Sequence, residues 1–308
     1  MIWCVAVVFI GILTNSLEIL IFNTGEMRKR SFSIYLTALA ASDSLYLVTF
    51  TLAHIFIYIK CMYMNDSTVL SLYHRKSVAC KVLQLSMDAF SDFSSLLILA
   101  FTIERYIACY HSLRLHWLCT RRSAIMFCMF AFVVIICSIT YPHVMFIDSH
   151  QCYKICTILP KNKDQFFYFY IVEVILFRLI PIILIAILNT LILKKLFNLQ
   201  NARKLSTTLD ASTQISSTNY NKQTRISIML LTVSTAYIVL YLPAIVNFIL
   251  DRFIVSGQLD ISHSIMAHYD NLSEAMGVTG FAINFFLYTM SGQTFREHLF
   301  QIISRYRL

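Results

Sequence analysis

The feature that most constrains this chain is a succession of long apolar stretches separated by mostly short polar connectors. A helix needs about 20 mostly apolar residues to cross the hydrocarbon core of a bilayer. Lipid offers no partners for backbone N–H and C=O groups, so stretches of this length cross membranes as helices. Seven windows qualify, at 2–23, 33–59, 79–107, 124–147, 166–195, 225–250 and 266–290. The sequence therefore predicts an all-α bundle of seven transmembrane helices.

The composition agrees with a bilayer as the solvent. Hydrophobic residues make up 58% of the 308 residues and charged residues only 13%, against about 25% charged residues in an ordinary soluble domain. In a soluble chain the net charge of +9 would suggest a nucleic-acid partner. Membrane proteins, however, gather Lys and Arg in their cytoplasmic loops. We therefore expect the lipid bilayer, and no nucleic acid, among the partners.

The distribution of basic residues predicts the orientation in the membrane. With the N-terminus outside, the inner loops and tail carry fifteen Lys and Arg residues and the outer loops carry eight. The positive-inside rule favours this orientation. We expect a multi-pass protein of the plasma membrane with an extracellular N-terminus. Its first span is interpreted as a retained helix, because neither a basic segment nor a cleavage site accompanies it.

Two connectors carry signals of their own. Asn65 begins an Asn-Asp-Ser glycosylation sequence in a connector predicted to lie outside. The longest connector, 196–224, is predicted to lie inside and contains a Ser/Thr-rich run at 206–218. This run is typical either of a flexible linker or of a phosphorylation segment.

The last residues differ from the seven spans. Phe295, Leu299, Ile302 and Ile303 repeat at helical spacing, with arginines between and beyond them. This pattern predicts a short amphipathic helix on the inner membrane surface. The chain is thus expected to contain a transmembrane domain at 1–290 and an amphipathic helix with a short cytoplasmic tail at 291–308.

Polar groups inside the spans are costly and therefore mark functional positions. Several occur in a characteristic order: GILTN at 11–15, LAASD at 39–43, Cys80, ERY at 104–106, Pro181, Pro243 and NFFLY at 284–288. On seven successive helices, this set resembles the rhodopsin-like (class A) G-protein-coupled receptors from end to end.

The resemblance implies a polar network at the bundle centre that binds water and an allosteric sodium ion. Its members are Asn15, Asp43, Ser94 and Asn284. No other metal or cofactor is expected. The alternative for Asp43 is a carboxyl group that burial keeps neutral.

The resemblance also implies coupling to a heterotrimeric G protein, with arrestin and a receptor kinase as further partners. The implied coupling residues are Glu104, Arg105, Tyr106, Leu113, Asn284 and Tyr288. A disulfide between Cys80 and the second outer loop is implied as well. Cys152 and Cys156 both lie in that loop. Cys156 is favoured because it leaves room for a hairpin before it, and Cys152 is the alternative.

The chain departs from the family pattern at several positions. Tyr241 replaces the usual tryptophan of the sixth helix, and the fourth helix has Phe132 near the position of its usual tryptophan. Asn189 replaces a tyrosine of the fifth helix. NFFLY lacks the usual proline, which removes a helix-kinking element. Three segments resemble those of invertebrate FMRFamide-like and myosuppressin-like neuropeptide receptors. They are the Asn-Phe pair of NFFLY, SIYLTALAASD and SGQTFR.

Ligand classes can be narrowed by the same resemblance. Met87 stands where amine receptors have an acid, and 266–290 lacks the lysine that opsins require. A peptide is therefore the expected ligand, and acidic side chains are expected to receive the arginine of an RF-amide-type peptide. Arg178 is the competing partner for those acids. The candidate ligand-binding residues are Met87, Asp88, Asp92, Glu173, Arg178, Tyr241 and Glu274.

Other functional classes fit less well. An intramembrane enzyme would need a GxGD or GxSxG motif or clustered metal-binding histidines, and the sequence has none of these. A transporter would be expected to show inverted repeats. A chemosensory receptor of the odorant type, on the same fold, is the main alternative to a neuropeptide receptor.

Overall fold

The computed structural model describes residues 2–25, 27–63, 67–110, 119–148, 157–158, 163–206, 214–255 and 262–306. The elements in chain order are α1 (Ile2–Phe22), η1 (Met27–Lys29), α2 (Phe32–Tyr63), α3 (Ser67–Tyr110), α4 (Arg121–Phe146), β1 (Ile147–Asp148), β2 (Thr157–Ile158), α5 (Lys163–Val174), η4 (Ile175–Leu179), α6 (Ile180–Ser206), α7 (Gln214–Val255), α8 (His263–Gly280), α9 (Asn284–Ser291) and α10 (Gln293–Tyr306). The two short strands form one antiparallel pair. The predicted all-α fold is confirmed.

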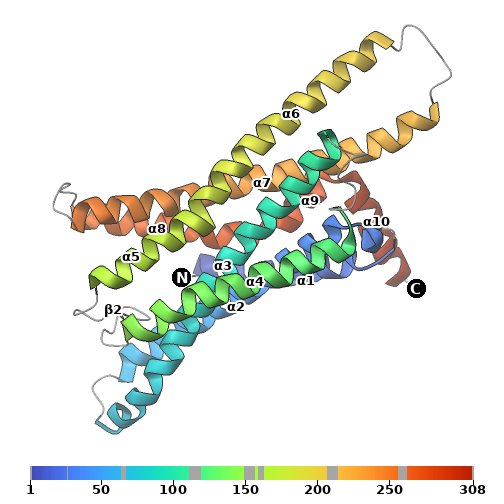
Figure 1. The fold of residues 1–308 in the computed structure, drawn as a ribbon. Coiled ribbons are helices and arrows are strands. Elements are labelled where there is room, and N and C mark those ends of the chain that lie inside the picture. The colour runs from blue at the N-terminus through green and yellow to red at the C-terminus, as the bar shows by residue number, and fades with distance from the viewer. Residues whose placement is uncertain are drawn as a thin grey trace.

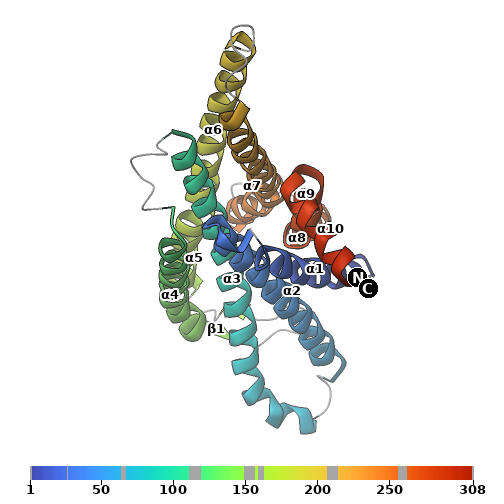
Figure 2. The same ribbon diagram turned by 90° about the vertical axis from the view of Figure 1, so that its right-hand side faces the viewer.

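The helices form a bundle in which α3 crosses the middle and α10 lies against the ends of α1 and α9 (Figures 1 and 2). Six segments of the described chain are long and apolar enough to cross a membrane, among them one that runs continuously through α5, η4 and α6. The seventh predicted span consists of α8 and α9, which a turn at 281–283 separates. Together these segments account for the predicted seven-helix bundle.

The predicted connector at 196–224 is wrong for most of its length. Helix α6 continues to Ser206 and α7 begins at Gln214, and both extend beyond the rest of the bundle (Figure 1). Leu, Lys, Gln, Ala and Arg together make up ten of the fourteen residues 191–204, and all five are strong helix formers. Extending an existing helix also avoids the cost of nucleating a new one. The phosphorylation of 206–218 stays a prediction.

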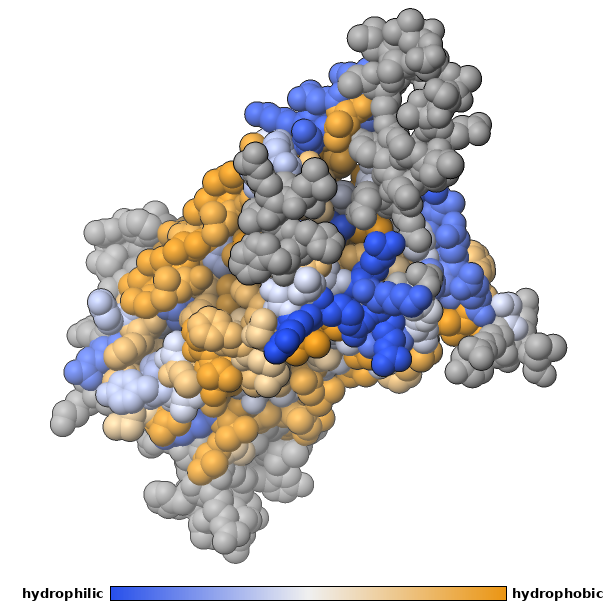
Figure 3. Space-filling model, turned by 45° about the vertical axis from the view of Figure 1, so that its right-hand side comes forward, coloured by the Kyte–Doolittle hydropathy of each residue, from blue (hydrophilic) through white to orange (hydrophobic). Residues whose placement is uncertain are grey.

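The surface of the bundle is suited to lipid. Helix α4 shows this most clearly, because Met129 and Phe130 are 65% and 69% exposed whereas Ile135 and Ile139 are completely buried. Figure 3 shows broad hydrophobic areas over the bundle and a dense hydrophilic group near one end. A soluble protein would not expose a continuous apolar surface of this extent.

The seventh segment is broken even though NFFLY lacks proline. Helix α8 ends at Gly280, Ala282 N–H bonds to the Thr279 carbonyl over 3.0 Å, and α9 begins at Asn284. Gly11 of α1 lies against this turn, and a Cβ atom built there would be only 2.8 Å from the Cβ of Ala282. Glycine therefore allows α1 to approach the turn closely.

Helix α10 is fixed to the end of α9. Arg296 donates hydrogen bonds of 2.9 Å to the carbonyl groups of Thr289 and Met290, which lie in the last turn of α9 and have no partner within the helix. Phe295 is fully buried, with its ring centroid 5.5 Å from those of Phe22 and Tyr288. The predicted short amphipathic helix is present, and the domain boundary at 290 stays a prediction.

Candidate functional site

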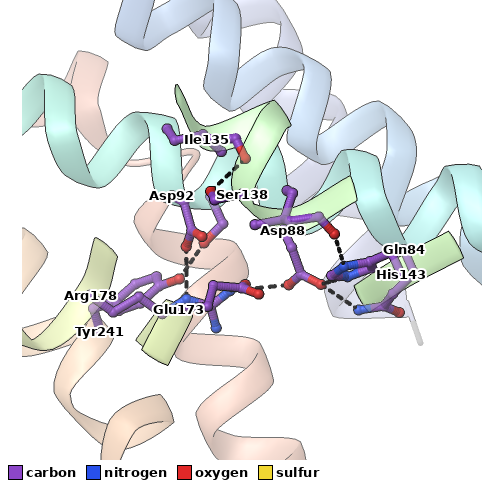
Figure 4. Close-up of polar contacts among 11 residues, drawn as sticks. Gln84, Asp88, Asp92, Ile135, Ser138, His143, Glu173, Arg178 and Tyr241 are labelled. Atoms are coloured by element: carbon purple, nitrogen blue, oxygen red, sulfur yellow. Dashed lines mark hydrogen bonds and ion pairs between the residues drawn. The ribbon is translucent and has the colours of Figure 1, made fainter. Parts of the chain in front are cut away.

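Arg178 is the centre of a charged cluster within the predicted outer half of the bundle (Figure 4). Its Nε donates a hydrogen bond of 2.8 Å to Asp92, and its Nη2 donates one of 3.1 Å to Asp88. The same Nη2 lies 3.4 Å from a carboxylate oxygen of Glu173. Four of the predicted ligand-binding residues therefore contact one another, with one guanidinium between three carboxylates.

Local helix geometry brings these side chains together. Asp88 and Asp92 are four residues apart on α3, which places them on one face of the helix. Glu173 and Arg178 are five residues apart, and Arg178 lies within the π-helical turn η4 at 175–179, which begins two residues after Glu173. A π-turn widens the helix to an i→i+5 repeat. The widened turn therefore lets both side chains point toward α3.

His143 of α4 completes the cluster and was not among the predicted site residues. Its Nε2 lies 2.9 Å from Asp88 and its Nδ1 lies 2.8 Å from the Ile139 carbonyl oxygen. Both ring nitrogens thus face oxygen atoms, and a neutral imidazole has only one N–H. A proton is therefore held between His143 and Asp88. Gln84 donates a further hydrogen bond of 3.0 Å to the same carboxylate.

The cluster contains three carboxyl groups, one guanidinium and one imidazole. The proton between His143 and Asp88 neutralises that pair, and Arg178 compensates one of the two remaining carboxylates, Asp92 and Glu173. With both of these ionised, one negative charge is left over. The side chains of Arg178 and Asp88 are 13% and 14% exposed, whereas that of Asp92 is fully buried. The exposed part of the cluster is therefore at Arg178 and Asp88.

Two tyrosines of α7 lie next to this cluster and bind α3. Tyr241 shares a hydrogen bond with Ser91, and Tyr237 donates one of 2.8 Å to Ser95. Their rings stack with centroids 5.2 Å apart, and Tyr241 interacts electrostatically with Arg178. The tyrosine that replaces the usual tryptophan is thus a polar connection between the two helices.

The other two ligand candidates lie elsewhere. Glu274 of α8 pairs with His54 of α2 over 3.4 Å, and both side chains are 48% exposed. Met87 is partly buried and packs against an apolar cluster that includes Tyr241 and Ile245. Neither makes a hydrogen bond or ion pair with Arg178 among the contacts of the described residues.

Asp43 is the centre of a second polar group, deep in the bundle. Ser94 donates a hydrogen bond of 2.6 Å to its Oδ1, and Asn284 donates one of 2.8 Å to its Oδ2. A cavity of about 20 Å³ adjoins all three residues, which is enough for one water molecule or a small ion. Carboxylate, hydroxyl and amide oxygens are ligands that hard cations prefer. These residues therefore fit the predicted sodium ion.

Asn15, another predicted member of this network, bonds to a backbone group. Its Nδ2 donates a hydrogen bond of 3.0 Å to the carbonyl oxygen of Phe281, within the turn between α8 and α9. This bond satisfies a backbone group that the helix break leaves without an intrahelical partner. Asn15 thus stabilises the broken seventh segment, and no direct bond to Asp43 occurs among the described contacts.

At the predicted inner end, Arg105 is held by its neighbours. Its Nη2 donates a hydrogen bond of 2.7 Å to Glu104 Oε1, and Ser31 donates one of 2.7 Å to the same oxygen. The guanidinium also lies over the ring of Phe32, 5.1 Å from its centroid, which is within cation–π range. Ser31 and Phe32 are contacts that the motif alone did not indicate.

A cavity of about 460 Å³ opens beside this pair and is lined by Lys29, Arg30, Ser31, Phe32, Glu104, Arg105, Ile107, Ala108, Cys119, Thr120, Arg121 and Ile226. Tyr106 packs near the contact between α6 and α7 at Ile192 and Leu231. Tyr288 is fully buried between Phe22 and Phe295. These coupling candidates therefore gather at one end of the bundle.

Several predicted residues lie outside the described chain, namely Asn65, Leu113, Cys152 and Cys156. Cys80 is fully buried in the part of α3 predicted to lie toward the outside, 13 residues after the helix begins at Ser67, and it packs with Phe146 and Phe166. The pairing of Cys80 with Cys156 or Cys152 stays a prediction.

Comparison with known families agrees with this arrangement. A family model described as 7 transmembrane receptor (rhodopsin family) matches residues 14–288. The match begins within α1 and ends at Tyr288 of α9, so it includes residues of all seven helical segments. A search of curated proteins gives no match to the chain. The family is one of receptors that bind an extracellular ligand and couple to G proteins, and it is not an enzyme family. The chain is therefore a multi-pass membrane protein that belongs to the rhodopsin family of seven-transmembrane receptors.

Proposed function

We propose that this receptor responds to an extracellular peptide whose positively charged group binds at the Arg178 cluster. The observation that carries the proposal is the surplus carboxylate around Arg178. Asp88, Asp92 and Glu173 all contact one guanidinium. Buried charges are stable when they are paired, and an unpaired one is costly. A guanidinium or ammonium group of a ligand would supply the missing positive charge.

Asp88 is the residue that such a ligand would meet first. It lies at the accessible edge of the cluster, and its partners His143 and Gln84 hold one face of its carboxylate. An arginine of the ligand can bind a carboxylate through two parallel hydrogen bonds. An RF-amide-type peptide has such an arginine next to its C-terminal phenylalanine. The resemblance to FMRFamide-like and myosuppressin-like receptors supports the same ligand class.

The signal would pass from this cluster to the inner end through α7 and the seventh segment. Tyr241 is close to Arg178 and bound to Ser91, so a ligand that displaces Arg178 also changes the contact between α3 and α7. Below this contact lies the polar group of Asp43, which we propose as the sodium site. Allosteric coupling requires two sites and an element with two arrangements between them.

At the inner end, we propose that activation releases Arg105 from Glu104 to contact the G protein. Arg105 Nε and Glu104 Oε2 are buried without hydrogen-bond partners among the described residues. The pair is therefore incompletely satisfied in this conformation, which lowers the cost of separating it. Leu113, Tyr106 and Tyr288 are proposed to complete the coupling surface. Arrestin and a receptor kinase are proposed as further partners, and the plasma membrane with the N-terminus outside as the location.

The ligand proposal is tested with a library of amidated peptides on cells that express the receptor, with a second-messenger readout. An active arginine-containing peptide is then compared with its citrulline analogue, which keeps the shape and loses the charge. We expect the citrulline analogue to lose potency on the wild type, and Asp88→Asn to reduce the difference between the two peptides. Glu297→Gln, on α10, is the matched control. Equal potency of the two peptides, or activation by uncharged volatile compounds alone, would contradict the proposal.

A further inference from the structure

Glu18 is a buried carboxylate that the family motifs do not include. It lies on α1, one turn after Asn15, and is fully buried. Neither of its carboxylate oxygens has a hydrogen-bond partner among the described residues. An isolated carboxylate in a low-dielectric interior costs several kcal/mol or more unless something compensates its charge. The protein therefore retains Glu18 at a considerable energetic cost.

Two neighbouring groups, a second carboxylate and a buried tyrosine, define the surroundings of Glu18. It interacts electrostatically with Asp43 of α2 and with Tyr288 of α9. The Tyr288 ring packs edge-on against Phe22, with centroids 5.3 Å apart. Phe22 follows Glu18 by four residues, which is one turn of the same helix face. The Tyr288 hydroxyl is buried and also lacks a hydrogen-bond partner among the described residues.

The unsatisfied atoms around Glu18 are mainly acceptors. They are both oxygens of Glu18, Oδ1 of Asn15 and the hydroxyl group of Tyr288. Asn15 and Glu18 are three residues apart, so their side chains are neighbours on α1. Among the ion pairs of the described residues, none involves Glu18 or Asp43. Arg105 and Arg178, two basic groups within the membrane, are bound to Glu104 and to the acidic cluster.

We propose that Glu18, the Asn15 Oδ1 atom and the Tyr288 hydroxyl bind a monovalent cation, at a position separate from the one next to Asp43. Oxygen ligands of this kind suit a hard cation such as sodium. A cation satisfies all the unpartnered oxygens at once and compensates the second carboxylate. The inference extends the proposed sodium site at Asp43, because the two carboxylates then hold two positive charges at the junction of α1, α2 and α9.

A proton on Glu18 is the competing explanation. It would neutralise the carboxylate and convert one of three acceptors into a donor. It would leave the charge balance sensitive to pH and insensitive to sodium. Sodium dependence at fixed pH therefore separates a bound cation from a bound proton.

The proposed cation also has a consequence for signalling. Tyr288 is one of the proposed coupling residues, and its ring lies between α1 and α10. A cation bound by Tyr288 and Glu18 stabilises the conformation in which Tyr288 is buried. A ligand that binds only one of two conformations shifts the equilibrium toward that conformation. Sodium at Glu18 is therefore expected to favour the resting state.

The test measures the unfolding midpoint Tm of the purified full-length receptor in lipid nanodiscs at fixed pH. Sodium chloride replaces choline chloride at constant ionic strength. The variants are Glu18→Gln, Tyr288→Phe and Asp43→Asn, with Glu297→Gln as the matched loss of an exposed carboxylate. A cation that binds only the folded state raises Tm with its concentration. We expect Glu18→Gln to need at least about tenfold more sodium than the wild type for the same rise in Tm. A loss of this size is typical when a group that supports a metal site is removed.

The variants distinguish this inference from the proposed Asp43 site. A weaker sodium response in Glu18→Gln and Tyr288→Phe, with part of the response retained in Asp43→Asn, supports the position at Glu18. A wild-type sodium response in Glu18→Gln overturns it and leaves the Asp43 site standing. A loss confined to Glu18→Gln and Tyr288→Phe supports Glu18 and contradicts the Asp43 site. If Glu18→Gln alters only the pH dependence of Tm, the group binds a proton and the inference is wrong.

Discussion

Arg178 of the fifth segment and Asp92 of α3 are joined by a hydrogen bond of 2.8 Å in which the aspartate side chain is fully buried. Breaking a buried ion pair by removing one partner typically costs 3–5 kcal/mol, because the other charge is left uncompensated. This pair is therefore both a structural contact and the deepest part of the proposed ligand site.

From this pair we predict that Arg178→Ala lowers receptor stability and surface expression strongly. The triple variant Arg178→Ala, Asp92→Asn, Glu173→Gln should recover much of the loss, because it also removes two of the uncompensated carboxylates. Thermal unfolding of the purified proteins and surface staining of intact cells measure both effects. If the triple variant is no more stable than the single one, the charge argument is wrong.

The bond between Tyr241 and Ser91 is expected to hold α7 against α3 in the resting state. Tyr241→Phe removes only the hydroxyl group and should raise basal signalling, with a loss of about 1 kcal/mol in the free energy of unfolding. Ser91→Ala should have the same effect. The double variant should add little, because both changes break one bond. Fully additive effects on basal second-messenger levels would show that the two residues act separately.

The outer disulfide is predicted to join Cys80 to Cys156. Cys80→Ser and Cys156→Ser should lower surface expression equally, because a disulfide typically contributes 2–4 kcal/mol, whereas Cys152→Ser should have little effect. Peptide mapping without reduction identifies the partner directly. A Cys80–Cys152 peptide would contradict the choice of partner, and an unmodified Cys80 thiol would contradict the disulfide.

The orientation in the membrane is predicted from the distribution of basic residues, and labelling of introduced cysteines tests it directly. A cysteine introduced at Lys161 should react with an impermeant thiol reagent on intact cells, and one introduced at Arg122 should react only after the membrane is permeabilised. Native cysteines that react from outside are first replaced by serine. Labelling of position 122 on intact cells would reverse the topology.

The number of spans and the polar residues within them could be predicted from the sequence. The partners of those polar residues could be predicted less well. Ser94 and Asn284 meet Asp43 as expected, because their order along the helices is tied to the family motifs. His143 and Glu18 could not be assigned roles in this way. Each is the only acidic or basic residue of its predicted span, and the helices of a membrane protein are apolar on nearly every face. Periodicity therefore does not reveal how each helix is rotated.

Two structural features differ from what the sequence predicted. The π-helical turn before Ile180 shifts the register of the fifth segment, and this shift brings Glu173 and Arg178 to the same side. The extension of α6 to Ser206 replaces much of an expected linker. The first has no simple residue signature, because it depends on packing against α3. The second is favoured by the helix formers at 191–204, but these residues do not indicate where the helix ends.

The central claim, that this chain transmits a signal through its inner end, is tested most directly by Arg105→Ala. Arg105 lies far along α3 from the Arg178 cluster, since Asp92 and Arg105 are separated by more than three helical turns. The variant should bind the active peptide and reach the surface like the wild type, and its second-messenger response should be abolished. Arg122→Ala, an exposed arginine on α4, is the matched control. Normal signalling by Arg105→Ala at normal expression would contradict the account.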